Sequence, residues 1–154
     1  TPVQNLSNKV KTIRAHAPAV AGAADITDSK VVDMQGYEGV RFIVGFGAIT
    51  AGAATSIKAQ QAVAKTSDTA LTSGADLAGT GITVADDADS KLVVLDIFRP
   101  RERYVQVHVL RATQNSVVDL VVAELYGARK LPVAQDSAEV SGQEVHASPA
   151  EGTA

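Results

Sequence analysis

The stretch VRFIVGFGAIT, Val40–Thr50, decides the fold class because its apolar residues recur at every second position. Side chains of a β-strand point alternately to opposite faces of a sheet, so this period predicts a strand. Gly45 and Gly47 indicate a bulge or the close approach of another backbone. Both faces are mainly apolar, so we expect the strand to be buried on both sides. One face would carry Val40, Phe42, Val44, Phe46 and Ala48, and the other Arg41, Ile43, Gly45, Gly47 and Ile49.

Strand patterns continue on both sides of this stretch. TAGAATS, residues 50–56, predicts a hairpin loop that leads into a weaker strand over residues 56–64. Three later segments, residues 91–98, 103–113 and 117–129, are rich in valine and separated by short turns, which predicts an antiparallel meander. With KVVDM, residues 30–34, the number of strands reaches six or more. Such spacing predicts an all-β protein, an antiparallel β-sandwich or jelly roll.

The two ends of the chain differ from its middle in composition. Residues 1–24 are rich in alanine and interrupted by proline, although NLSNKVKTIRAHA, residues 5–17, also fits a short helix. Residues 134–154 are small and polar and cannot form a core alone. We therefore expect an N-terminal arm over 1–24, a sandwich domain over 25–133 and a C-terminal arm or tail over 134–154. The last segment is either a disordered tail or an arm on a neighbouring subunit, anchored by Val140 and Val145.

The overall composition favours one soluble domain with a modest core. The chain has 154 residues, of which 45% are hydrophobic but only 4% are aromatic, so each buried side chain contributes little apolar area. A net charge of −3 gives no general attraction for nucleic acid. The absence of cysteine excludes disulfides and thiolate metal sites. Without an apolar run of membrane-spanning length or a signal peptide, we expect synthesis in the cytoplasm and no membrane partner.

Four arginines are the candidate partner-binding residues. Arg99, Arg101 and Arg103 recur at every second position around Pro100, so their side chains could project to one side of an extended segment. A phosphate-binding row would also need aromatic side chains for base stacking and fewer acidic neighbours, so we expect no nucleic-acid partner. Guanidinium groups form good two-pronged contacts with carboxylates. We therefore expect these three residues to be solvated or to contact acidic groups of a partner protein, and we include Arg129 among the candidate contacts.

Patterns that would indicate catalysis or a cofactor are missing. The three histidines, His16, His108 and His146, are dispersed without metal-ligand spacing. The acidic loop DDADS, residues 86–90, lacks the glycine and glutamate of a calcium-binding loop. GFGAITAG lacks the third glycine of a dinucleotide-binding turn, and no serine stands in a nucleophile elbow. We expect no catalytic residue, no metal, no cofactor and no enzymatic activity.

The order of several segments resembles small structural proteins of tailed bacteriophages. VVDMQGYEGVRFIVGFGAIT, residues 31–50, is similar to a Gly-Tyr-Glu-x-Val-x-Phe strand that leads to a Gly-Ala-Ile-Thr turn in that family. DLAGTG (76–81), RYVQVHVLRAT (103–113) and LYGARKLPV (125–133) follow in the family's order, and the terminal SPAEGTA is also similar. The resemblance covers about residues 30–133. The chain departs from the pattern in its alanine-rich loop and in its arginine-rich corner.

Such proteins resemble head decoration or cement proteins of the capsid. The resemblance implies a homo-oligomer, a dimer or trimer, that binds the outer surface of the virion shell. Its partner would be the major capsid protein, whose subunit contacts it would stabilise. Two alternatives stay open: a tail or head-completion structural protein, and a sandwich that binds glycans on the host surface. The second is weakened by the absence of tryptophan and by only three tyrosines to stack on sugar rings.

Overall fold

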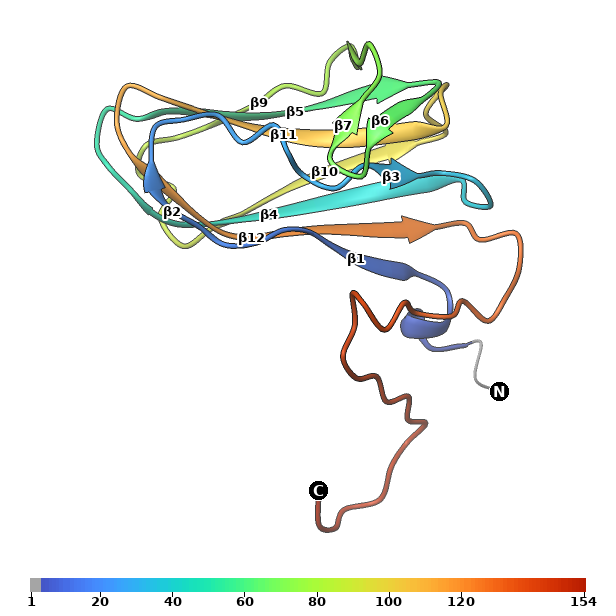
Figure 1. Cartoon of the computed structure of the whole chain (residues 1–154). Coiled ribbons are helices and arrows are strands. Elements are labelled where there is room, and N and C mark those ends of the chain that lie inside the picture. The colour runs from blue at the N-terminus through green and yellow to red at the C-terminus, as the bar shows by residue number, and fades with distance from the viewer. Residues whose placement is uncertain (1–3) are drawn as a thin grey trace.

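The computed structural model describes residues 4–154 and contains two antiparallel β-sheets packed face to face (Figure 1). This arrangement confirms the prediction of an all-β sandwich. In the described part of the chain, a 3₁₀ turn lies at Leu6–Asn8. No helix within residues 4–154 has the length and apolar character that a membrane span requires.

The two sheets are built from strands that are far apart in the sequence. Sheet A has the order β1 (Lys11–His16), β12 (Ser116–Tyr126), β4 (Gly39–Ile49) and β10 (Leu92–Phe98), and β2 (Ala19–Gly22) also pairs with β12. Sheet B has the order β3 (Val32–Asp33), β11 (Tyr104–Ala112), β5 (Ala54–Ala62) and β8 (Ala75–Asp76), and β9 (Ile82–Val84) also pairs with β5. A small hairpin joins β6 (Lys65–Ser67) to β7 (Ala70–Leu71).

The core lies between the sheets and follows the alternation of the central strands. In β4 the inner face carries fully buried side chains from Val40 to Phe46, as the sequence predicts. The alternation then changes phase, because Ala48 is exposed and Ile49 is buried. Irregular register between β4 and the start of β12 accounts for this change. The expected burial of both faces is wrong, since Arg41 on the outer face is exposed.

Consecutive strands change sheet instead of pairing. The loop after β4 carries the chain from sheet A to β5 in sheet B, so the predicted hairpin at residues 50–56 is wrong. The predicted meander is also wrong, because β10 and β12 belong to sheet A whereas β11 between them belongs to sheet B. A strand with alternating residues must place its apolar face against the core. A strand can do this whether it pairs with the preceding strand in a hairpin or crosses to the opposite sheet, so the sequence pattern does not distinguish the two.

Most of the expected N-terminal arm belongs to the sandwich. Within the range 1–24, β1 and β2 both pair with β12 at one side of sheet A. The alternative of a helix over residues 5–17 is wrong as well, because Lys11–His16 is extended. A short helix ended by Pro18 would gain little stability alone, whereas pairing with β12 satisfies the backbone and buries Ala15.

Candidate functional site

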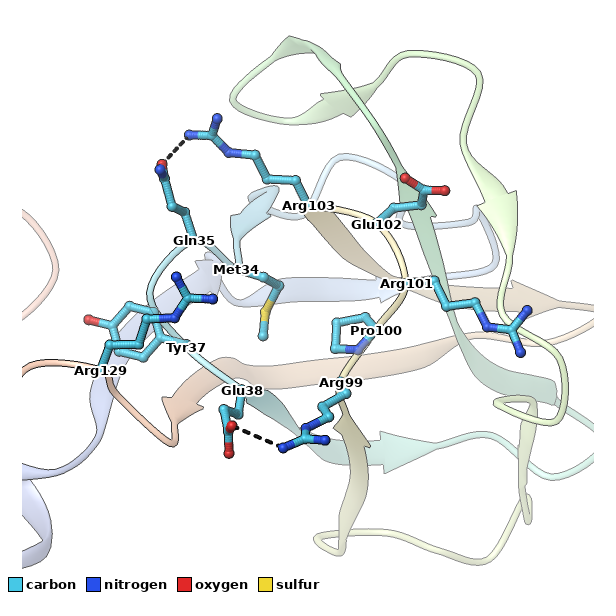
Figure 2. Close-up of a pocket in the computed structure, with 10 residues that line it drawn as sticks. All are labelled: Met34, Gln35, Tyr37, Glu38, Arg99, Pro100, Arg101, Glu102, Arg103 and Arg129. Atoms are coloured by element: carbon cyan, nitrogen blue, oxygen red, sulfur yellow. Dashed lines mark hydrogen bonds and ion pairs between the residues drawn. The ribbon is translucent and has the colours of Figure 1, made fainter.

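The four predicted arginines line one pocket at an end of the sandwich (Figure 2). The pocket has a volume of about 540 Å³ and lies between the β3–β4 connection and the β10–β11 corner. Its walls are formed by Met34, Gln35, Tyr37, Glu38, Arg99, Pro100, Arg101, Glu102, Arg103 and Arg129. Arg129 follows the end of β12, and its backbone N–H donates to the carbonyl of Gly36 at 2.9 Å. The fold therefore brings together residues that the sequence separates.

Arg99 makes the sharp turn that ends β10. Its φ of 52° is uncommon for a residue with a side chain, and the following Pro100 already disfavours the right-handed helical conformation. The turn is held by Glu38, whose carbonyl accepts the Arg99 N–H at 2.7 Å and whose Oε1 lies 3.2 Å from Arg99 Nη2. The guanidinium also lies over the ring of Phe98, 5.0 Å from its centroid. Arg99 is thus fixed by its own chain.

Arg103 joins the start of β11 to β3. Its Nε and Nη2 each lie 2.9 Å from an oxygen of the Asp33 carboxylate, and Nη2 also donates to Gln35 Oε1 at 2.7 Å. The hydrogen bonding from Arg103 lowers the pKa of Asp33 from its ordinary value. The two-pronged pair fixes the orientation of this guanidinium as well.

Arg101 and Arg129 differ from the other two arginines because their guanidinium groups are free. Both residues are exposed, and neither side chain forms a hydrogen bond or ion pair with any residue in the range 4–154. Their backbones are held: the Arg101 N–H donates to Gln61 Oε1 at 3.1 Å, and Arg129 is tied to Gly36. Two donor groups on a fixed frame are therefore available to a ligand.

A second hollow lies on the other side of the corner. It has a volume of about 450 Å³ and shares Arg99, Pro100 and Arg101 with the first pocket. The side chain of Arg101 points away from Met34 and Tyr37, toward this second side (Figure 2). The corner is therefore a ridge between two hollows, with a free guanidinium on it.

The charges of the pocket favour an acidic ligand. Four arginines and two glutamates line it, and Asp33 pairs with Arg103 beside the lining, which leaves an excess of one positive charge. Burial raises the pKa of Tyr37 further above neutral pH, so this residue adds no negative charge to the pocket. The lining includes no histidine, serine or aspartate that could form a nucleophile and base pair. The arrangement is suited to binding carboxylate groups through guanidinium forks.

Val140 and Val145 do not lie in the arginine-lined pocket. Both are half-buried in the C-terminal segment, residues 134–154, and Val140 lines a separate hollow of about 300 Å³ beside β1. Sequence reasoning missed the polar residues that hold this segment. Gln135 Oε1 accepts the Thr12 N–H at 2.9 Å, and Glu139 Oε2 accepts the Arg14 N–H at 3.0 Å. The start of this segment is therefore held against β1 of its own chain by hydrogen bonds to the side chains of Gln135 and Glu139.

The three histidines lie at separate places and have separate partners. His108 is buried and contacts Gln106 Oε1 at 3.1 Å, and burial lowers its pKa. His16 lies 3.0 Å from Asp28, and His146 lies 3.0 Å from Glu144. Among residues 4–154, no group of three or more potential ligands is placed to hold a metal ion.

Comparison with models of known protein families gave no match for this chain, and comparison with curated protein sequences gave none.

Proposed function

We propose that this protein is a static protein-binding module, a head decoration or cement protein that binds the major capsid protein on the outer shell of a tailed bacteriophage. The observation that carries the proposal is the pair of free guanidinium groups, Arg101 and Arg129, on a frame fixed by Arg99–Glu38 and Arg103–Asp33. Such a frame is suited to acidic side chains of a neighbouring protein. The family resemblance supplies the identity of that neighbour.

Weak contacts are sufficient for this role. An exposed ion pair contributes about 0.2–1 kcal/mol, so one copy of the pocket binds weakly. A closed shell repeats the same contact over many symmetric positions, and simultaneous contacts greatly increase the overall binding strength. A rigid sandwich that loses little entropy on binding fits this use of many small contacts.

The first test measures binding to capsid shells that lack this protein. We expect the double variant Arg101→Ala/Arg129→Ala to bind about tenfold more weakly, because it removes two contacts of up to about 1 kcal/mol each. The matched control, Lys9→Ala/Lys11→Ala, removes the same charge from the start of β1 and the turn before it, and should bind within about twofold of the wild type. Equal losses in both variants would indicate a general effect of charge and would contradict the proposed site.

The second test counts copies in purified virus particles by quantitative gel densitometry. A cement protein predicts many copies in a fixed ratio to the major capsid protein, and particles without it should rupture at lower temperature. A few copies per particle would instead indicate the tail or head-completion role, and binding of the free protein to glycans would indicate an attachment role.

A further inference from the structure

The β10 edge of sheet A is open. Strand β10 pairs with β4 on one side and with no strand on the other side in residues 4–154. Its exposed side chains are mostly apolar: Leu92 is 63% exposed, Val94 43% and Phe98 58%. An exposed apolar edge strand is a template for pairing with another strand, and soluble proteins normally protect such edges.

Two hydrogen bonds show which backbone groups of β10 face outward. The Phe46 N–H donates to the Lys91 carbonyl at 3.0 Å, and the Arg99 N–H donates to the Glu38 carbonyl at 2.7 Å. In an antiparallel pair, residues alternate between those that bond to the partner strand and those that point away from it. The odd-numbered residues of β10 therefore bond to β4. The N–H and C=O groups of Leu92, Val94, Asp96 and Phe98 point to the open side.

The only charged side chain of β10, Asp96, points away from the open side of the strand. Asp96 Oδ1 accepts a hydrogen bond from the Tyr126 hydroxyl at 2.5 Å, so this carboxylate is directed toward sheet A. At the end of the strand, Arg99 turns away and pairs with Glu38. Neither charge therefore points to the open side of the strand, although two Asp96 carboxylates would still repel each other in a register that places them opposite one another.

We propose that β10 pairs with β10 of a second copy of this chain, antiparallel and about a two-fold axis at Leu95. The four outward residues are spaced so that Leu92 would face Phe98 of the partner copy, and Val94 would face Asp96. This register uses every outward backbone group and forms about eight hydrogen bonds. On the inner side it places apolar residues opposite one another, Val93 facing Ile97 and Leu95 facing Leu95.

The neighbouring registers are less favourable. Moving the axis to Asp96 would place two carboxylates opposite each other, which is destabilising in a cross-strand pair. Moving the axis to Val94 would leave Phe98 without a partner and form about six hydrogen bonds. The sequence of β10 is thus self-complementary in one register, which favours a second copy over an unrelated strand as the occupant. This inference does not depend on the capsid role.

The register is tested by cross-linking single-cysteine variants, since the wild-type chain contains no cysteine. Facing residues that are not hydrogen-bonded have Cα atoms about 4.5 Å apart, which is within disulfide range. We expect Leu95→Cys to form a disulfide-linked dimer under mild oxidation. The control Val20→Cys, at a position 84% exposed on β2, should cross-link much less. Faster cross-linking of Val94→Cys than of Leu95→Cys would overturn the register.

Because Leu95 is a buried core residue, a second measurement does not rely on its replacement. The N–H of Val94 points outward, so Val94→Pro removes no hydrogen bond of the single copy but blocks pairing at the centre of the edge. In sedimentation experiments we expect wild-type dimers of twice the chain mass of 15.9 kDa, and monomers of Val94→Pro with unchanged circular dichroism. A wild type that stays monomeric at about 100 μM, or a Val94→Pro variant that stays dimeric, would overturn the proposal.

Discussion

The two edges of sheet A differ in whether their outward backbone groups have hydrogen-bond partners. At the β1 edge, the outward N–H groups of Thr12 and Arg14 donate to side-chain oxygens of Gln135 and Glu139. At the β10 edge, the outward groups from Leu92 to Phe98 face no strand within residues 4–154. One edge is closed from within, and the other is left open.

The difference shows what the C-terminal segment contributes. It adds no strand, yet Gln135 also donates to the Val10 carbonyl at 2.6 Å, and the Glu139 carboxylate pairs with Lys30. These side chains form hydrogen bonds with outward backbone groups of β1. Those donors and acceptors are then not left at this edge for another strand to pair with. The β10 edge has apolar side chains and no such cover from residues 4–154, so pairing with a partner strand would satisfy its outward backbone groups.

The largest effect is expected from removing the cover of the closed edge. A chain that stops after Val133 loses the hydrogen bonds of Gln135 and Glu139, each of which contributes roughly 0.5–1.5 kcal/mol. We expect the free energy of unfolding in urea to fall by about 3 kcal/mol, and β1 to become a new site of self-association. An unchanged stability would show that the segment only rests on the sandwich.

A smaller effect is expected from one charge in that cover. Glu139→Gln keeps an oxygen for the Arg14 N–H but loses the pair with Lys30, in which the Glu139 side chain is only 12% exposed. We expect a loss of about 1 kcal/mol in the same unfolding measurement. The control Glu144→Gln, whose side chain is 83% exposed, should change stability by less than about 0.5 kcal/mol.

The smallest effect concerns pH at the open edge. Burial, together with the hydrogen bond to Asp96 on β10, raises the pKa of Tyr126 to about 12. A raised pKa stabilises the folded state below the ordinary value of 10, and this contribution is lost as pH rises from 10 to 12. Solvent screening keeps it below about 1 kcal/mol. We expect Asp96→Asn to lower the pH at which Tyr126 forms tyrosinate, followed by ultraviolet absorbance. An unchanged titration of Tyr126 would mean that Asp96 does not contribute to its raised pKa.

The sequence was sufficient to predict the central strands, but not β1 and β2 and not which strands pair. Alternation from Val40 to Phe46 identifies the inner face because burial follows the period of two. The same alternation is compatible with a hairpin or with a crossing to the other sheet, so β10 and β11 were wrongly expected to pair. A hairpin and a crossing differ in the backbone geometry of the corner. Arg99 has a positive φ there, which an arginine in the sequence does not predict.

The arrangement of the arginines was predicted only in part for a similar reason, and their role as partner contacts stays a prediction. The spacing of Arg99, Arg101 and Arg103 predicted side chains on one side of an extended segment, which is wrong for Arg101, because its side chain points toward the second hollow. Arg129 lines the first pocket because Tyr126 on β12 pairs with Gly39 on β4. Whether an arginine side chain is paired or free depends on Glu38 and Asp33, which lie far from the arginines in the sequence. Gln135 and Glu139 were missed because a polar composition predicts no core and says nothing about capping an edge.

Amide hydrogen exchange, measured residue by residue at several protein concentrations, tests the contrast between the two edges most directly. We expect the Thr12 and Arg14 amides to be protected equally at every concentration, because their acceptors belong to the same chain. The Val94 and Asp96 amides should exchange rapidly in dilute protein and become protected as the concentration rises. Protection of the Val94 amide that does not depend on concentration would contradict the account.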